Sequence, residues 1–218
     1  MIDLHTHTIF SDGELIPAEL VRRAVSVGYR ALAITDHMDQ SNIDLIIPRI
    51  VKTVRALRGV MPIKVFAGAE LTHVPPSQIA DLVREARTLG AQLVVVHGET
   101  LVEPVAEGTN RAAIEACVDI LAHPGLISDE DLLLAKERGV TLEVTARKGH
   151  SLSNGHVAQR AFEFGVPITV NSDAHSPNDL ITKSFARMVL AGAGVPADKI
   201  DAVFAHGRKL VETALGRA

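Results

Sequence analysis

Residues 1–14 of the chain are MIDLHTHTIFSDGE, a short apolar segment that leads into two histidines and an Asp12-Gly13 turn. In an extended strand alternate side chains point to the same face, so His5 and His7 present both imidazoles on one side. Two imidazoles on one face suit a metal ion, but a pair of ligands does not complete a site. The remaining ligands must come from elsewhere in the chain.

The same arrangement of a short apolar segment followed by polar residues recurs along the chain. The apolar segments are rich in Val, Ile and Leu, as in parallel strands buried on both faces, and amphipathic stretches typical of helices separate them. Strands are predicted at 2–5, 31–37, 63–71, 92–99, 118–125, 141–147 and 167–175, with no eighth strand. Helices are predicted at 17–28, 42–59, 77–90, 109–117, 128–139 and 154–165, and further helices follow from about residue 178. Seven β-then-α units predict one parallel α/β domain over residues 1–218.

Histidine and carboxylate side chains stand at the end of every predicted strand, separated by about one βα unit. They are His5, His7, Asp36, His37, Glu70, His97, His123, Glu143, Asp173 and His175. An open, doubly wound sheet would spread these ends along a line, whereas a closed barrel gathers them into a ring at its carboxyl-terminal end. So many imidazoles packed together without a metal would leave buried polar groups unpaired. The pattern therefore favours a TIM-like (β/α)7 barrel with a metal site.

Composition excludes several classes of protein. A net charge of −4, one Tyr and no Trp argue against a nucleic-acid partner bound through a basic or base-stacking surface. The lone Cys117 excludes an intrachain disulfide and is expected to be a small, buried apolar residue. No apolar run is long enough for a membrane helix and no signal-peptide pattern is present, so a cytoplasmic location is expected. The sequence carries no signal for the oligomeric state.

Six ordered motifs resemble those of the polymerase and histidinol phosphatase (PHP) family of metal-dependent phosphoesterases. They are DLHTHTIFSDG (3–13), ITDH (34–37), GAEL (68–71), VVVHGE (94–99), ILAHPG (120–125) and NSDAH (171–175). The resemblance spans nearly the whole domain. It implies a distorted (β/α)7 barrel, in agreement with the seven units, and a site for up to three divalent ions, which are Zn, Mn or Fe.

The resemblance also implies which residues bind each ion. The first ion would be held by His5, His7, Glu70 and Asp173; the second by Glu70, His97 and His123; the third by Asp12, His37 and His175. Some family members have a histidine where this chain has Asp12, and the harder carboxylate oxygen shifts the preference of the third site towards Mn or Mg.

The catalytic residues would then be His5, His7, Glu70, His97, Asp173 and His175. Water coordinated to such ions has its pKa lowered to ~7 and attacks phosphorus, so no Ser or Cys nucleophile is required.

Three residues outside this set are candidates for substrate binding. Arg147 follows the sixth strand and can bind a phosphate through two donors, the alternative being a solvated loop arginine. Glu99 and Arg111 belong to a polar stretch after the fourth strand, which either borders the pocket or is an ordinary βα connection.

Two carboxylates, Asp36 and Glu143, are expected to orient ligand imidazoles rather than bind metal themselves. The four remaining histidines are interpreted as surface residues of loops or helices: His73, His150, His156 and His206. Of these, His73 and His150 are close enough to the site to touch substrate.

The leading hypothesis is hydrolysis of a small phosphomonoester, with histidinol phosphate or a nucleotide as examples, and the predicted partner is a small phosphorylated metabolite. A PHP-type exonuclease or phosphodiesterase is a weaker alternative, because the chain lacks basic and aromatic character. Amidohydrolase chemistry is a further alternative, but the predicted strands offer no lysine that could bridge two metal ions. The non-enzymatic alternative is a metal-binding regulatory module.

Overall fold

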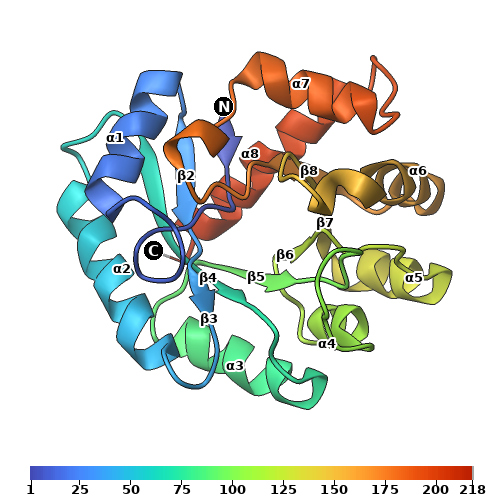
Figure 1. Ribbon diagram of the computed structural model, residues 1–218, viewed down its shortest axis with the longest axis horizontal. Helices are drawn as coiled ribbons and strands as arrows, with labels where there is room; N and C mark the ends of the chain where they lie inside the picture. The colour runs from blue at the N-terminus through green and yellow to red at the C-terminus, as the bar shows by residue number, and fades with distance from the viewer. Residues whose placement is uncertain (218) are drawn as a thin grey trace.

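The computed structural model describes residues 1–217, in which eight parallel strands are surrounded by helices (Figure 1). The strands are β1 (Ile2–Asp3), β2 (Ala31–Ile34), β3 (His37–Met38), β4 (Lys64–Leu71), β5 (Leu93–His97), β6 (Ile120–Ala122), β7 (Thr141–Thr145) and β8 (Ile168–Asn171). Their order around the sheet is β1-β2-β4-β5-β6-β7-β8, with β3 also paired to β4. This alternating, nearly closed arrangement confirms the predicted TIM-like barrel.

The strand predicted at 31–37 is divided into β2 and β3, which corrects the expectation of no eighth strand. Both parts pair with β4 in one register, Ile34 opposite Ala67 and His37 opposite Glu70. Between them, Thr35 exchanges hydrogen bonds with Thr6 in the segment that continues β1. The interruption turns the chain towards β1 at the carboxyl end of the barrel.

Eight helices lie around and beneath the strands, close to the predicted positions. They are α1 (Pro17–Val27), α2 (Ile43–Leu57), α3 (Pro76–Thr88), α4 (Thr109–Glu115), α5 (Asp129–Arg138), α6 (Asn154–Phe164), α7 (Lys183–Gly192) and α8 (Ile200–Leu215). Ser128 caps α5 by accepting a hydrogen bond from the Asp131 N–H, as its position predicts. None of the helices in residues 1–217 is both long enough and apolar enough to cross a membrane.

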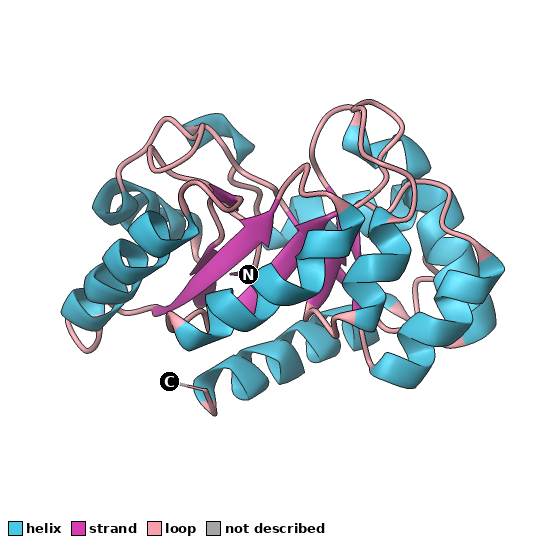
Figure 2. Ribbon diagram, turned by 90° about the horizontal axis from the view of Figure 1, so that it is seen from below, coloured by secondary structure: helices cyan, strands magenta, loops and turns pink. Residues whose placement is uncertain are grey.

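The amino-terminal end of the barrel is filled by apolar side chains. Leu4, which follows β1, packs there with Phe66, Leu93 and Ile120 of β4, β5 and β6 and with Val211 of α8. Figure 2 shows α8 running beneath the strands. Because these side chains fill the space between the strands at this end, the interior of the barrel is open only towards the carboxyl-terminal end.

The barrel closes between β1 and β8 through a short seam. In the described part of the chain the only β-pairing across it is a single bridge between Thr6 and Ala174. The His7 N–H donates to the Ala174 carbonyl at 2.9 Å, and the Asp173 N–H donates to the His5 carbonyl at 3.1 Å. The residues that close the barrel therefore neighbour or include the predicted metal ligands.

Cys117 is exposed, so the expectation that it is buried is wrong. It lies between α4 and β6, where its φ of 54° turns the chain towards the strand.

Candidate metal centre

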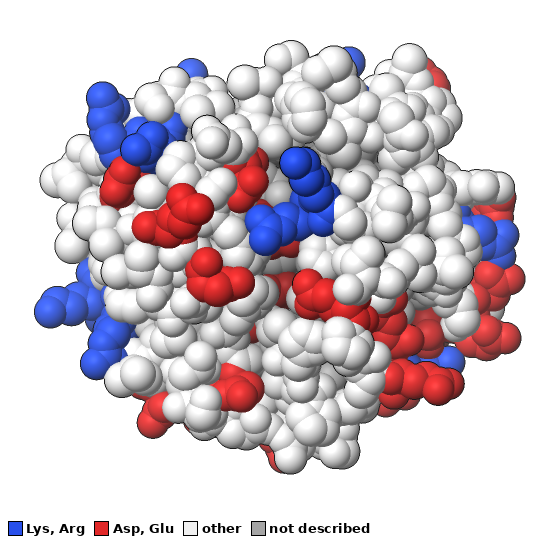
Figure 3. Space-filling model, in the orientation of Figure 1, with Lys and Arg blue, Asp and Glu red and all other residues white. Residues whose placement is uncertain are grey.

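The nine predicted metal ligands lie around the carboxyl-terminal end of the barrel, where a cavity of about 220 Å³ opens. Its lining consists of Asp12, His37, Thr72, His73, His97, Glu103, Arg147, His150, Asp173 and His175. Figure 3 shows a hollow near the middle of one face, bordered by acidic side chains and with one group of basic side chains beside it.

The first predicted group brings together residues from three strands. His5 and His7 lie directly after β1, Glu70 belongs to β4, and Asp173 follows β8. The Nε2 atom of His7 is 3.2 Å from Asp173 Oδ1, and Nε2 of His5 is 3.2 Å from Glu70 Oε1. All four side chains are buried, and His5, His7 and Asp173 have ligand atoms close enough to share one ion.

The third predicted group lies at the mouth of the cavity. The Nε2 atoms of His37 and His175 face one another at 3.3 Å. Asp12 places Oδ1 at 3.4 Å from the first and 3.3 Å from the second. Two imidazole nitrogens and a carboxylate oxygen directed at one point form a partial ligand set for a divalent cation.

The second predicted group differs in its carboxylate. His97 and His123 are neighbours, with ring centroids 4.5 Å apart, and His150 joins them as a third possible ligand. Glu70 instead contacts His5 and the Nδ1 of His37, the latter at 2.7 Å. That Glu70 bridges the first and second ions remains a prediction.

The hydrogen bonds around these imidazoles fit a metal centre. In five of them Nδ1 lies 2.7 to 3.1 Å from a carbonyl or carboxylate oxygen. The partners are Glu143 for His5 and His123, Glu70 for His37, the Gly98 carbonyl for His97 and the Asp173 carbonyl for His175. Such oxygens only accept, so Nδ1 carries a hydrogen in each ring and Nε2 is the nitrogen left for a metal ion.

Several of these inward-facing atoms are buried without a hydrogen-bond partner. They include His5 Nε2, both nitrogens of His7, His123 Nε2, Glu70 Oε1 and Asp173 Oδ1. Buried lone pairs left unpaired are costly, and divalent cations would satisfy them together. The donor set therefore fits the metal ions that the sequence motifs imply.

Charge is divided unevenly among the ligands. Burial lowers the pKa of His7 to about 3, and burial next to His123 lowers the pKa of His97 to about 4, so both are neutral near pH 7. The carboxylates of Glu70 and Asp12 overcome the effect of burial on His37 and raise the pKa of its imidazole to about 10. A metal ion bound to His37 must displace that proton, so metal and proton compete there.

Local backbone geometry directs some of these side chains into the cavity. His123 and Asp173 have positive φ values of 30° and 54°, which only a few per cent of non-glycine residues adopt. Strained conformations of this kind concentrate at functional sites.

Of the two carboxylates expected to orient imidazoles, Glu143 does so. Asp36 instead accepts hydrogen bonds from the Thr8 N–H and from the hydroxyls of Thr8 and Ser11. It therefore holds the loop that carries Asp12 rather than an imidazole ring.

The three candidate substrate-binding residues have different surroundings. Arg147 lines the cavity, is partly exposed and lies 3.4 Å from Asp179. Glu99 accepts a hydrogen bond from the Asn110 N–H, close to the start of α4. Arg111 forms an ion pair with Asp131 of α5 at 2.6 Å. Only Arg147 among the three lines the cavity.

Two residues at the site escaped the sequence analysis in part or entirely. His150 is buried and lines the cavity, which corrects its interpretation as a surface residue. Glu103, in the loop after β5, lies 3.2 Å from His97 Nε2 and also contacts His73 and His150. Both residues follow strands in βα loops, several residues beyond the strand ends to which the sequence search was confined.

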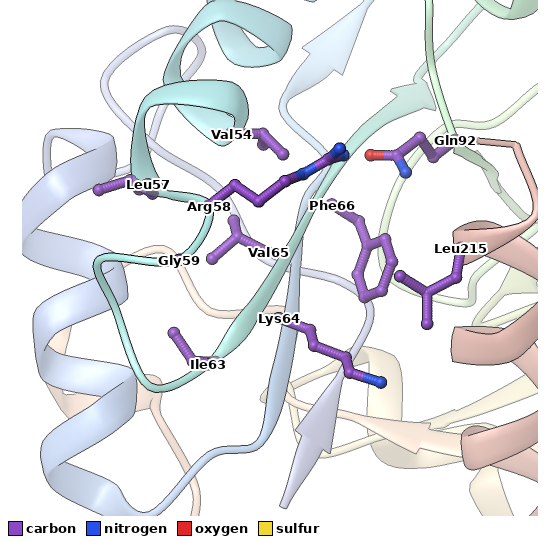
Figure 4. Close-up of a pocket in the computed structure, with 10 residues that line it drawn as sticks. All are labelled: Val54, Leu57, Arg58, Gly59, Ile63, Lys64, Val65, Phe66, Gln92 and Leu215. Atoms are coloured by element: carbon purple, nitrogen blue, oxygen red, sulfur yellow. The ribbon is translucent and has the colours of Figure 1, made fainter.

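A larger cavity, of about 480 Å³, lies at the opposite end of the barrel (Figure 4). It is bordered by the end of α2, the first residues of β4 and Leu215 of α8. Arg58 and Lys64 are its charged residues, and it contains no histidine or carboxylate. Of these two cavities, only the smaller one is lined by side chains that could bind a metal ion.

The chain is similar in sequence to several archaeal and bacterial proteins. An uncharacterized protein of Methanocaldococcus jannaschii is 49% identical over 94% of this chain and 94% of its own. A protein of Thermoanaerobacter sp. named a probable phosphatase is 28% identical over 92% of this chain and 89% of its own. Ribonuclease P protein component 3 of Methanosarcina mazei is 28% identical over 96% of this chain and 88% of its own.

Solved structures share the fold at low identity. Histidinol phosphate phosphatase of Lactococcus lactis, complexed with zinc, L-histidinol and phosphate, has a TM-score of 0.60 at 17% identity, over 89% of this chain and 94% of that one. A chain of an archaeal ribonuclease P with mature tRNA has a TM-score of 0.69 at 19% identity, over 98% of this chain and 89% of that one. Residues 3–150, more than half of the chain, match the PHP domain family. The chain therefore belongs to the PHP domain family, as its motifs predicted.

Proposed function

We propose that the protein is a metal-dependent phosphoesterase that hydrolyses a small phosphomonoester at a site holding up to three divalent ions. The observation that carries this proposal is the clustering of buried imidazole nitrogens and carboxylate oxygens, many without a hydrogen-bond partner, at the carboxyl-terminal end of the barrel. Divalent ions bound there would supply Lewis acidity and an activated water for attack on phosphorus. The name of the Thermoanaerobacter relative supports the same reaction class.

The residues of the chain prepare this chemistry before substrate arrives. Glu143 accepts the Nδ1 hydrogens of His5 and His123 and receives the Asn171 amide at 2.8 Å, so two rings and their acceptor form one rigid unit. A guanidinium at the edge of the cavity, that of Arg147, can donate two parallel hydrogen bonds to phosphate oxygens. A cavity of about 220 Å³ has room for a phosphoryl group and a small part of its alcohol.

No side chain is needed as a covalent nucleophile. Cys117, the one cysteine of the sequence, precedes β6 and therefore lies at the amino-terminal end of the barrel, opposite to the site. We thus assign hydrolysis to direct attack by water on the phosphoryl group, with the alcohol as leaving group.

The test is a phosphatase screen over phosphorylated metabolites with Mn²⁺ or Zn²⁺ added, using His5→Ala as the blank. His5→Ala and His97→Ala should keep the fold, shown by circular dichroism, and lose hydrolysis by several orders of magnitude. Turnover of a monoester near the wild-type rate in either variant contradicts the proposal.

The alternatives give different results in the same screen. Cleavage of dinucleotides or single-stranded nucleic acid, without cleavage of monoesters, indicates a phosphodiesterase. Saturating metal binding with no turnover of any ester indicates a non-catalytic module. The similarity to ribonuclease P protein component 3 makes an RNA-binding measurement a necessary part of the panel.

A further inference from the structure

We propose that His150 and Glu103 complete a metal site with His97 and His123, and that Glu103 is its exchangeable ligand, displaced by the phosphate of an incoming substrate. The metal site itself is independent of the reaction. The exchange of Glu103 rests on the proposed phosphoesterase function. Neither residue belongs to the ligand set that the sequence motifs imply.

The three imidazoles come from three successive units of the barrel. His97 ends β5, His123 follows β6, and His150 begins a 3-10 turn after β7. The ring centroids of His123 and His150 are 4.2 Å apart, and one nitrogen of each of the three rings lies within 4.8 Å of the other two.

All three rings are buried, so the group is part of the barrel interior. His123 Nε2 has no hydrogen-bond partner, and His150 Nδ1 is 2.8 Å from the Thr100 hydroxyl, which can accept its hydrogen and leave Nε2 free. Rings packed for structural reasons would be expected to satisfy these nitrogens. Lone pairs turned towards a shared point instead suit a cation.

Glu103 supplies the fourth ligand and lies next to two of the three imidazoles. Its Oε2 is 3.2 Å from His97 Nε2, and its Oε1 is 3.3 Å from His150 Nε2. Three imidazoles and one carboxylate are a ligand set that zinc accepts in tetrahedral geometry. The Glu103 side chain is 37% exposed, whereas the three imidazoles are at most 7% exposed. It can therefore leave without disturbing the packing of the barrel.

A phosphate and Glu103 cannot both occupy this position. Glu103 and Arg147 line the same cavity, and a phosphate held by Arg147 would meet the carboxylate as a second anion. Like charges at close range repel strongly where water is excluded. Substrate would therefore take the coordination position of Glu103, and the carboxylate would return when inorganic phosphate leaves.

The metal half is tested by counting ions. Chelated protein is reloaded with Zn²⁺ or Co²⁺ and dialysed, metal per chain is measured by elemental analysis, and the visible spectrum of the cobalt form reports four-coordinate geometry. His150→Ala and the bulkier His150→Gln should each lose one bound equivalent and the four-coordinate cobalt absorption. His156→Ala, which removes a half-buried imidazole bonded to the Ile127 carbonyl, should keep both. A wild-type count and spectrum in either His150 variant overturns the proposal.

The exchange half is tested with inorganic phosphate as the probe. Removing the competing charge in Glu103→Gln should tighten phosphate binding to the metal-loaded protein by about tenfold in calorimetry. Glu107→Gln makes the same charge change at an exposed position of the same loop and should leave the affinity unchanged. Equal phosphate affinities in the two variants overturn the exchange.

These measurements separate this inference from the proposed function, because metal counting needs no turnover. If no ester is hydrolysed but His150→Ala loses one ion, the function fails and the four-ligand site stands. If esters are hydrolysed but His150→Ala keeps every ion, the site fails and the function stands.

Discussion

Glu143 shows how one buried residue organises the centre from behind the ligands. Its two oxygens accept hydrogens from His5 and His123, whose rings are stacked with their centroids 5.7 Å apart. Those contacts overcome the effect of burial and lower the pKa of Glu143 to about 2, so the carboxylate stays ionised. An ionised partner fixes the tautomer of each ring and raises its basicity towards a metal.

Glu143→Gln should weaken metal binding while leaving the fold intact. The glutamine amide fits the same space but carries no charge and accepts at only one oxygen, so one of the two rings loses its acceptor. We expect the affinity for Zn²⁺ or Mn²⁺ to fall by about 10- to 100-fold in calorimetry. Glu107→Gln serves as the exposed control, and equal affinities in the two variants would show that Glu143 has no part in metal binding.

Asp3 gives the folded protein a specific dependence on pH. Burial raises its pKa from 3.8 to about 6, although the Ser172 N–H and the Tyr29 hydroxyl both donate to it. The folded state therefore holds a proton that the unfolded chain releases near pH 4. This contribution to stability is present below about pH 4 and is lost as the pH rises through 6.

Asp3→Asn should remove this dependence in metal-free protein. Relative to the wild type, the variant should gain stability between pH 4 and pH 7, by on the order of 3 kcal/mol for a shift of about two pKa units. Urea unfolding at the two pH values, with a chelator present, measures the difference. A gap between variant and wild type that stays constant with pH would refute the assignment to Asp3.

At the scale of elements, the loop between β1 and α1 depends on close backbone packing. A Cβ added at Gly13 would lie 2.7 Å from the carbonyl carbon and oxygen of His7. The Gly13 N–H also donates to the Thr8 carbonyl at 2.9 Å, which folds the loop back on β1. Only glycine permits this approach, and it is what brings Asp12 to His37 and His175.

Gly13→Ala should therefore displace Asp12 and cost the protein the ion of the third group. We expect one fewer bound equivalent and a loss of about 1–3 kcal/mol in unfolding free energy, because the clash is with backbone atoms. Gly155→Ala is the matched control, since a Cβ there meets nothing within 4 Å and lies in α6. Elemental analysis and thermal melts compare the two, and a full metal count in Gly13→Ala would disprove the role of the turn.

Periodic elements were predictable because their patterns are local. Val-rich β5 and the capped helix after Ser128 appear where composition and capping place them. The division of the second strand was not predictable, because Thr35 is held by Thr6 from another strand. Glu103 escaped for the same reason, since nothing within its own loop sequence indicates that it reaches His97.

For the molecule as a whole, the weakest closure and the metal centre coincide. The segments that follow β1 and β8 share one bridge, between Thr6 and Ala174, whereas other neighbouring strands pair over two to four residues. Ions held by His5 and His7 on one side and Asp173 on the other would join the two strands across this seam. Metal binding should therefore stabilise the closure of the barrel as well as the site.

Amide hydrogen exchange with and without metal tests this coupling. The His7 and Asp173 amides form the bonds across the seam, so their exchange reports its opening. An ion at a hundred times its dissociation constant adds about 2.7 kcal/mol, which should slow seam exchange by about 100-fold if opening releases the ion. His97→Ala removes a ligand that lies away from the seam and should leave most of this protection in place. A ligand that binds only the closed barrel must oppose opening of the seam. Equal exchange rates of the His7 and Asp173 amides in chelated and metal-loaded wild type would therefore mean that the ions do not stabilise closure of the barrel.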